Sequence, residues 1–325
     1  MHEPTYSFVI PLCNEEAVLA ELHRRLDAVS QSLDGASEFI MVDDGSADDT
    51  RRELLKLRDR DSRVKVVALS RNFGHQMAIS AGLDFAGGKA VVIMDGDLQD
   101  PPELVPKMIA RWREGFDVVH ATRSALLGEG KLRRVLKSLS YRLLRRASPH
   151  NLRVNTGDFR LVDRRVVEIV RNMHETNPYL RGTFAWVGFR QTEVHFDRPE
   201  RFAGDPKYNL PRLAALAVDG MVGFSVAPLR FALALGFLIS SLSFAAAAIV
   251  AVLQLSGTSN PPGWTSLMVL VSFLAGIQLI ILGVMGLYVG QISEQGRGRP
   301  RYLIAEAHGL SSEAARSAPQ RIGLR

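Results

Sequence analysis

Residues 91–103 read VVIMDGDLQDPPE, an apolar run that ends in two aspartates one residue apart and then two prolines. The run is typical of a buried strand. Residues i and i+2 of a strand project to the same side, so Asp95 and Asp97 could share one divalent cation, with Gly96 keeping the approach open. Gln99 would add an oxygen, and oxygen ligands suit Mg²⁺ or Mn²⁺ bound together with substrate phosphates. The stretch therefore predicts a site for a divalent metal with substrate phosphates, and its alternative is a turn or a helix cap.

Apolar runs and helical patterns alternate over the first half of the chain. Strands are predicted at 6–10, 38–42, 64–69, 90–94 and 116–121, with helices at 15–33, 48–60, 74–86 and 103–114. This order predicts an α/β fold with a mostly parallel sheet. Ligands of such sheets bind beyond the carboxyl ends of the strands, where Asp43, Asp44, Asp95 and Asp97 lie. No G-x-G-x-x-G motif follows the first strand, which excludes a nucleotide-binding dehydrogenase.

Charge is distributed unevenly along the 325 residues, because residues 231–293 contain no Asp, Glu, Lys or Arg. Two membrane spans are predicted there, at about 231–255 and 265–290, joined by a short uncharged loop. Each has about 25 residues, or roughly 37 Å as helix, which is enough to cross a hydrocarbon core of about 30 Å. Arginines flank the outer ends at Arg230, Arg297, Arg299 and Arg301. Positive charge at both ends predicts a helical hairpin with both ends in the cytoplasm, and the alternative is two buried core helices.

The remaining segments complete the predicted organisation. Residues 131–147 form a basic amphipathic pattern that suits either an acceptor phosphate or anionic lipid. We expect a cytosolic catalytic domain at 1–209, amphipathic juxtamembrane helices at 210–230, two transmembrane helices within 231–293 and a cytosolic basic tail at 294–325. With membrane spans present, the net charge of +6 favours acidic substrates or a membrane surface over nucleic acid. The single Cys13 excludes an internal disulfide and cysteine zinc sites.

Several further motifs stand in a fixed order. They are FVIPLCNEE (8–16), FIMVDDGSADDT (39–50), SRNFGHQMAISAGLDFA (70–86), MDGDLQDPPE (94–103), ATRS (121–124), NTGDFRLVDRRVV (155–167), PYLRGTFAWVGF (178–189) and RPERFAGDPKYNLPRL (198–213). Together they closely resemble glycosyltransferase family 2, whose nucleotide-sugar domain has the GT-A fold. With two C-terminal spans, the chain is similar to the polyprenyl-phosphate hexosyltransferases, which include dolichol-phosphate mannose synthases and bactoprenol glucosyltransferases. The resemblance covers roughly residues 5–300.

The resemblance implies a set of site residues. The nucleotide sugar is expected at Pro11, Cys13, Glu15, Asp43, Asp95 and Arg123, the metal at Asp95, Asp97 and Gln99, and the acceptor phosphate at Arg134, Ser138, Arg198, Arg201 and Lys207. Catalytic roles are expected for Asp158, Asp97 and Arg134. Asp158 matches the family's candidate base. Because a phosphate monoester with a second pKa of about 6 is already largely a dianion at neutral pH, Asp158 could orient the acceptor instead of deprotonating it. His75 is expected to be structural.

The resemblance also implies the reaction. A hexose is transferred with inversion from a nucleotide sugar to a polyprenyl phosphate, with Mg²⁺ or Mn²⁺, at the cytoplasmic face of the inner membrane. The stretch RGTFAWVGF (181–189) favours glucose, UDP-glucose and undecaprenyl phosphate. Alternatives are a mannose synthase using GDP-mannose, an aminosugar transferase, a sugar-acceptor enzyme or a membrane-anchored nucleotide-sugar-binding scaffold. Small residues in the spans, such as Gly276, Gly283 and Gly286, would permit a homo-oligomer.

Overall fold

The computed structural model describes residues 4–123, 156–196 without 174, 176 and 177, scattered residues and short runs between 229 and 252, and 263–310. The chain divides into two units. One comprises Met1–Arg145, Pro149–Lys207 and Arg299–Arg325, and the other comprises Arg146–Ser148 and Tyr208–Gly298. The predicted basic helix at 131–147, the acceptor residues Arg134, Ser138, Arg198, Arg201 and Lys207, and the segment at 210–228 lie outside the described residues.

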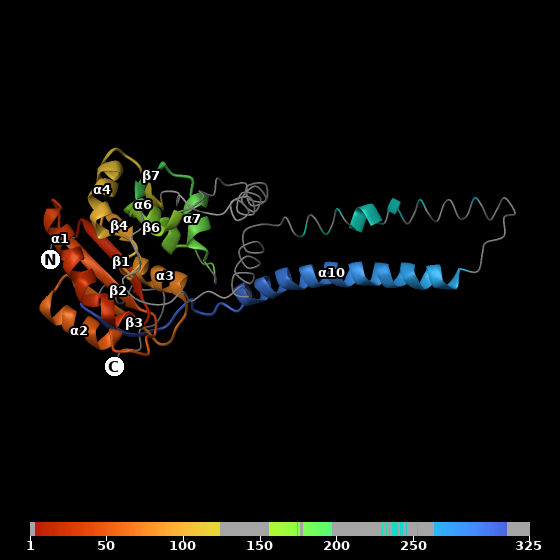
Figure 1. Ribbon diagram of the computed structural model, residues 1–325, viewed down its shortest axis with the longest axis horizontal. Coiled ribbons are helices and arrows are strands. Elements are labelled where there is room, and N and C mark those ends of the chain that lie inside the picture. The colour runs from red at the N-terminus through yellow and green to blue at the C-terminus, as the bar shows by residue number, and fades with distance from the viewer. Residues whose placement is uncertain are drawn as a thin grey trace, which may run out of the picture. The chain divides into compact units, whose positions relative to one another are not determined.

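The first unit is built on one sheet whose strands run mostly in parallel (Figure 1). Its strands are β1 (Tyr6–Leu12), β2 (Ser37–Asp43), β3 (Val64–Leu69), β4 (Ala90–Ile93), β5 (Val118–Arg123), β6 (Thr156–Asp163), β7 (Gln191–Phe196) and β8 (Ile304–His308). They lie in the order β7-β5-β6-β4-β1-β2-β3-β8. Strands β1 to β4 pair in parallel, whereas β6 and β8 run antiparallel to their neighbours. The predicted GT-A-like α/β fold is therefore confirmed.

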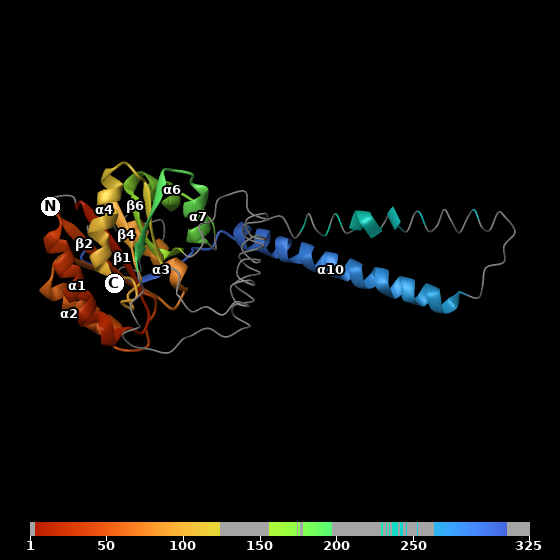
Figure 2. The same cartoon turned by 45° about the horizontal axis from the view of Figure 1, so that its top comes forward.

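Helices cover both faces of this sheet because its strands bury side chains on both sides (Figure 2). One layer contains α1 (Leu19–Ser32), α2 (Thr50–Arg60) and α4 (Val105–Arg113), and the other contains α3 (His75–Phe85), α6 (Arg164–Arg171) and α7 (Leu180–Trp186). Short 3₁₀ turns, η1 (Glu16–Val18) and η2 (Pro102–Leu104), precede α1 and α4. In β1, Phe8 belongs to the core beneath α1, and its neighbour Val9 belongs to the core beneath α3. This alternation follows from the two-residue period of a strand.

The segment after residue 296 corrects the predicted domain boundaries. Residues 294–325 were expected to form a tail, but β8 pairs antiparallel with β3 and forms an edge of the sheet of the first unit. Tyr302 is fully buried, and its hydroxyl donates to Asp84 Oδ2 of α3 at 2.5 Å. The pairing joins residues more than two hundred positions apart, so no local pattern could indicate it. The first unit therefore includes chain from both sides of residues 231–293.

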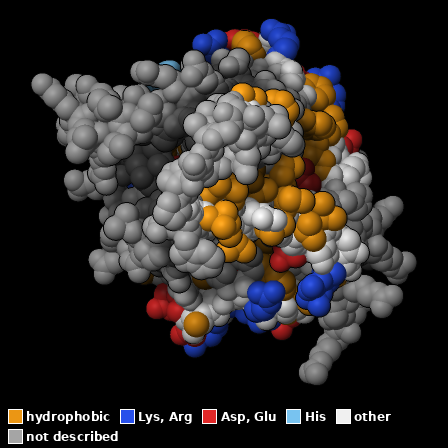
Figure 3. All heavy atoms as spheres, turned by 90° about the vertical axis from the view of Figure 1, so that its right-hand side faces the viewer, with side chains coloured by type: hydrophobic (Ala, Val, Ile, Leu, Met, Phe, Trp, Pro, Cys, Tyr) orange, Lys and Arg blue, Asp and Glu red, His pale blue; other side chains and the backbone are white. Residues whose placement is uncertain are grey.

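The second unit contains one long apolar helix, α10 (Trp264–Gly296). Within the described part of the chain, its segment Phe273–Gly296 is the one stretch long and apolar enough to cross a membrane, with a mean hydropathy of 2.1. Side chains such as Phe273, Leu279 and Ile280 are exposed. Hydrophobic side chains also dominate the described part of the face in Figure 3. The other predicted span, 231–255, lies mostly outside the described residues, so the two-helix hairpin stays a prediction.

Candidate active site

The loop after β4 carries the two aspartates from which the sequence analysis started. Strand β4 ends at Ile93, so the expectation that Asp95 and Asp97 project from an extended strand is wrong. They lie in a turn, where the Asp95 N–H donates to Asp100 Oδ2 and the Gln99 N–H donates to Asp97 Oδ1, both at 3.1 Å. The Asp97 and Asp100 side chains thus accept hydrogen bonds from backbone N–H groups of the loop once it leaves the sheet.

Close packing holds this loop against the end of β1. A Cβ added at Gly96 would lie 2.3 Å from Leu12 Cδ2, so a larger residue here would require the buried Leu12 side chain to shift. Leu98 adopts φ +60°, a left-handed conformation that costs a non-glycine residue of order 1 kcal/mol or more, and its side chain is buried in the core. The loop conformation is therefore determined by packing against the core.

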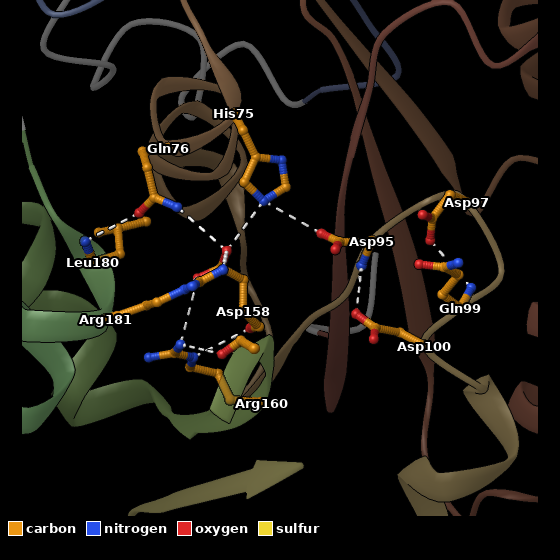
Figure 4. Close-up of polar contacts among 11 residues, drawn as sticks. His75, Gln76, Asp95, Asp97, Gln99, Asp100, Asp158, Arg160, Leu180 and Arg181 are labelled. Atoms are coloured by element: carbon orange, nitrogen blue, oxygen red, sulfur yellow. Dashed lines mark hydrogen bonds and ion pairs between the residues drawn. The ribbon is translucent and has the colours of Figure 1, made fainter. Parts of the chain in front are cut away.

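Asp158 of β6 lies at the centre of a polar network (Figure 4). Arg181 of α7 binds it with two hydrogen bonds, Nε to Oδ1 at 3.0 Å and Nη2 to Oδ2 at 2.9 Å. His75, the first residue of α3, places Nε2 3.3 Å from Asp158 Oδ2 and also 3.3 Å from Asp95 Oδ1. Gln76 Nε2 donates to Asp158 Oδ2 at 3.4 Å, and its Oε1 accepts from the Leu180 N–H at 3.1 Å. The network thus joins α3, β6 and α7 to the loop after β4.

The electrostatics of the two buried carboxylates differ. Burial raises the pKa of Asp95, the His75 charge opposes this effect, and the charges of Asp158 and Asp97 add to the increase. Burial would also raise the pKa of Asp158, but hydrogen bonds from His75 and Arg181 and the charges of Arg181 and Arg160 hold it far below its usual range. Asp158 is therefore an ionised carboxylate. Asp95 has less positive charge around it, so its ionised form is less well stabilised.

The oxygens of the loop fit a divalent cation. Asp95 Oδ1 and Gln99 Oε1 are buried and accept no hydrogen bond from the part of the chain that the structure describes. Buried acceptors normally have partners, and carboxylate and amide oxygens are ligands for Mg²⁺ and Mn²⁺. Within those same residues, no group of three or more His, Cys, Asp and Glu side chains is placed to hold a metal without further ligands. A cation here would therefore need additional ligands from water and substrate phosphates, as is usual for Mg²⁺.

The residues expected to hold the nucleotide follow β1 and β2. Pro11 is buried within β1, opposite Val42 of β2. Cys13 Sγ accepts from Asn72 Nδ2 at 3.2 Å, and the Glu15 N–H donates to Thr50 Oγ1 at 2.9 Å. The carboxyl ends of β1, β2 and β4 lie at the same edge of the sheet because these strands pair in parallel. These turns therefore border the loop of Asp95 on that edge.

The aspartates after β2 have separate structural roles. Asp43 Oδ1 accepts from the Ser46 N–H at 3.0 Å. Asp44 accepts from the N–H groups of Phe73 and Gly74 at 2.7 and 3.0 Å and so fixes the entry to α3. Neither Asp44 nor Ser46 caps α2, whose N-cap position is Asp49. Asp43 is thus at the site edge, while its neighbour Asp44 holds the segment that presents His75.

The structure brings together Asp95, Asp97, Gln99 and Asp158 from the predicted set. Arg123 is the last residue of β5, in register with Phe196 of β7. Sequence reasoning missed the active-site placement of His75, Gln76 and Arg181, although each lies within a motif that carries the family resemblance. Their placement depends on contacts with Asp158 across 83, 82 and 23 positions, respectively. His75 and Gln76 were recognisable only as residues at a helix start.

Comparisons with known proteins agree with this architecture. The model of glycosyl transferase family 2 matches residues 7–170. The uncharacterized glycosyltransferase YkcC of Bacillus subtilis (strain 168) is 42% identical over 311 residues, which cover 95% of each chain. The uncharacterized glycosyltransferase sll0501 of Synechocystis sp. is 43% identical, covering 94% of this chain and 96% of its own. The SfII prophage-derived bactoprenol glucosyl transferase of Shigella flexneri is 36% identical over 93% of this chain and 98% of its own.

Proposed function

The chain belongs to glycosyltransferase family 2 and is a glycosyltransferase, and we propose that it transfers a hexose to a polyprenyl phosphate. The donor we favour is UDP-glucose, and the acceptor is undecaprenyl phosphate. The name of the Shigella flexneri relative, a bactoprenol glucosyl transferase that is similar along nearly the whole chain, supports glucose as the sugar and a bactoprenol acceptor. The choice of UDP as the nucleotide follows from the family resemblance of the sequence motifs. The product would be a polyprenyl-phosphate hexose for modification of a cell-envelope glycan.

The donor is placed at the carboxyl edge of the sheet. The turns after β1 and β2 would contact the nucleoside through Cys13, Glu15 and Asp43, and the loop after β4 would face the diphosphate. Asp95, Asp97 and Gln99 would hold Mg²⁺ or Mn²⁺, which when bound stabilises negative charge on a leaving diphosphate. The buried oxygens of Asp95 and Gln99 are the observation that carries this assignment, because neither accepts a hydrogen bond from the described residues and Asp95 Oδ1 is met only by the longer, 3.3 Å ion pair with His75.

The acceptor reacts through a phosphate oxygen. That oxygen forms a bond to the anomeric carbon as the bond from this carbon to the nucleoside diphosphate breaks, which inverts the configuration. No proton needs to be removed from a phosphate dianion. Asp158 is a poor proton acceptor, since donors from His75, Gln76 and Arg181 stabilise its ionised form. These contacts support an orienting role for Asp158 over the role of general base.

The position of β8 bears on the proposed membrane topology. The sheet contains chain from before residue 197 and from after residue 303, so the chain must leave and return on the same side of a membrane. If α10 crosses the membrane once, a second crossing between residues 197 and 263 is required. This supports the predicted hairpin with its first span at about 231–255. The arginines at its outer ends favour the cytoplasm as the side of the catalytic domain.

The proposal is tested by transfer of label into lipid. Membranes containing the full chain are incubated with undecaprenyl phosphate and, in parallel, with radiolabelled UDP-glucose, GDP-mannose or UDP-N-acetylglucosamine, and organic-extractable label is counted. We expect label from UDP-glucose, loss of transfer with EDTA, and recovery with Mg²⁺ or Mn²⁺.

Variants locate the activity in the proposed site. Asp95→Asn and Asp97→Asn should each lower the rate at least about a hundredfold, as expected when a group that stabilises transition-state charge is removed. Asp59→Asn is the matched control, because Asp59 is an exposed aspartate paired with Arg58 on the surface. Full transfer by the Asp95→Asn/Asp97→Asn double variant, or no lipid-linked label from any donor, would contradict the proposal.

A further inference from the structure

Asp158 binds only one edge of the Arg181 guanidinium. Nε and Nη2 donate to the two carboxylate oxygens, which fixes the plane of the guanidinium. Nη1 donates to none of the described residues, and the Arg181 side chain is 45% exposed. The guanidinium is therefore fixed in orientation, and its Nη1 can donate hydrogen bonds to a ligand.

Among the described residues beside Asp158, Arg181 is the permanently charged side chain that a ligand can reach. Arg160, the other arginine near Asp158, has only 2% of its side chain exposed and lies over the Phe184 ring at 4.7 Å. Burial lowers the pKa of Arg160 to about 10, although it remains charged at neutral pH. Of the two arginines beside Asp158, Arg160 is buried and Arg181 is the one whose side chain is exposed.

The location of this charge matches the needs of the reaction. His75 Nε2 contacts both Asp158 and Asp95, so the carboxylate that holds Arg181 is one side chain away from the loop assigned to the diphosphate (Figure 4). Two anions must approach each other for transfer, and a planar guanidinium is the side chain best suited to phosphate oxygens.

A purely structural role accounts less well for these contacts. Gln76 already ties α7 to α3 through the Leu180 N–H, and it also donates to Asp158. Arg160 donates to the backbone carbonyls of Gly157 and Asp158 and so holds β6 locally. Asp158 thus has other donors, and a half-exposed arginine is not needed to satisfy it.

We infer that Arg181 is a phosphate-binding residue of this active site, with Asp158 as the residue that positions its guanidinium. The inference rests on the proposed function, and its ligand is a phosphate oxygen of either the donor diphosphate or the lipid phosphate. Arg181→Gln should weaken binding of one of these about ten- to a hundredfold, the usual contribution of a charged hydrogen bond. Arg181→Lys should recover part of the loss, because it restores the charge without the planar fork.

Binding is measured without turnover, so that the test is independent of sugar transfer. Full-length protein in detergent with Mg²⁺ is titrated calorimetrically with inorganic pyrophosphate, as a probe of the diphosphate site, and with farnesyl phosphate, as a probe of the acceptor site. Arg165→Gln is the matched control: Arg165 also pairs with a buried aspartate, Asp117, at 2.6 Å, but on the surface away from this network. A thermal melt of each variant verifies that it is folded.

Weaker pyrophosphate binding by Arg181→Gln assigns Arg181 to the donor, and weaker farnesyl phosphate binding assigns it to the acceptor. The inference is overturned if both affinities match those of the wild type, if Arg165→Gln produces the same loss, or if the wild type binds neither probe. If Arg181→Gln does not fold, Arg181→Lys decides: wild-type affinity for both probes then counts against phosphate recognition by the guanidinium. Absence of lipid-linked sugar in the transfer assay would instead be a failure of the proposed function.

Discussion

Replacing Asp158 by Asn should destabilise the catalytic domain, because it leaves a buried charge without its counter-ion. Arg160 Nη2 lies 3.5 Å from Asp158 Oδ1, and both side chains are almost fully buried. Arg160 cannot swing out freely, since Nε and Nη2 donate to the carbonyls of Asp158 and Gly157 at 3.1 and 2.8 Å. Breaking one partner of a buried pair typically costs about 3–5 kcal/mol. That is a large part of the roughly 5–15 kcal/mol by which a domain is stable.

A double-mutant cycle isolates this effect. Arg160→Met removes the stranded charge while filling similar volume, so Asp158→Asn/Arg160→Met should be more stable than Asp158→Asn alone by about 2 kcal/mol. Unfolding of the full chain in detergent is followed by tryptophan fluorescence against denaturant. Glu168→Gln serves as control, because the exposed pair of Glu168 with Arg164 should contribute less than about 1 kcal/mol.

Two results would refute this reasoning. One is an Asp158→Asn variant within about 1 kcal/mol of the wild type, and the other is strict additivity of the two single substitutions. The cycle also separates two causes of lost activity. Asp158→Asn would lower activity both by destabilising the fold and by removing the carboxylate from the active site. Sugar transfer by the restabilised double variant, at saturating substrate, reports the local contribution alone.

Two further substitutions test the packing of the domain. Tyr302→Phe removes the hydroxyl that donates to Asp84 and should cost about 1.5–3 kcal/mol at neutral pH. Burial raises the pKa of Asp84, and this hydrogen bond opposes the increase. The loss of stability should therefore be small below about pH 4, where the carboxyl is protonated in the folded and the unfolded protein, and should grow as the pH rises through the pKa of the folded protein. A loss of stability that does not depend on pH in denaturant titrations contradicts this. Gly82→Ala places a Cβ 2.3 Å from Val9 Cγ1 on a stiff, β-branched side chain in the core, and overpacking should cost about 1–3 kcal/mol by the same measurement. An unchanged midpoint would mean that α3 moves away from β1 without penalty.

Much of the fold could be predicted from local pattern. The five predicted strands correspond to β1 to β5, with ends that differ by at most two residues, because alternation, β-branched runs and turn residues are local signals. The same signals placed α1 to α4 between them. They also predicted the site loop at 95–99, although the sequence suggested a strand end where the structure has a turn. The conformation of the turn depends on the side chains of Asp97 and Asp100 and on packing against Leu12. The two-residue period of a strand carries no information about these contacts.

Other features were decided by tertiary structure. Strand β8 joins the sheet from beyond the apolar helix, and Tyr302 completes the core next to α3, so the boundary of the catalytic domain is not contiguous in sequence. His75 and Arg181 acquire their significance from Asp158, which lies 83 and 23 positions away, respectively. The sequence by itself determined the family, the order of elements and the acidic loop, because these depend on neighbouring residues. Only the fold decided which charges face one another, because hydrogen bonds and ion pairs act over a few ångströms in space whatever their separation along the chain.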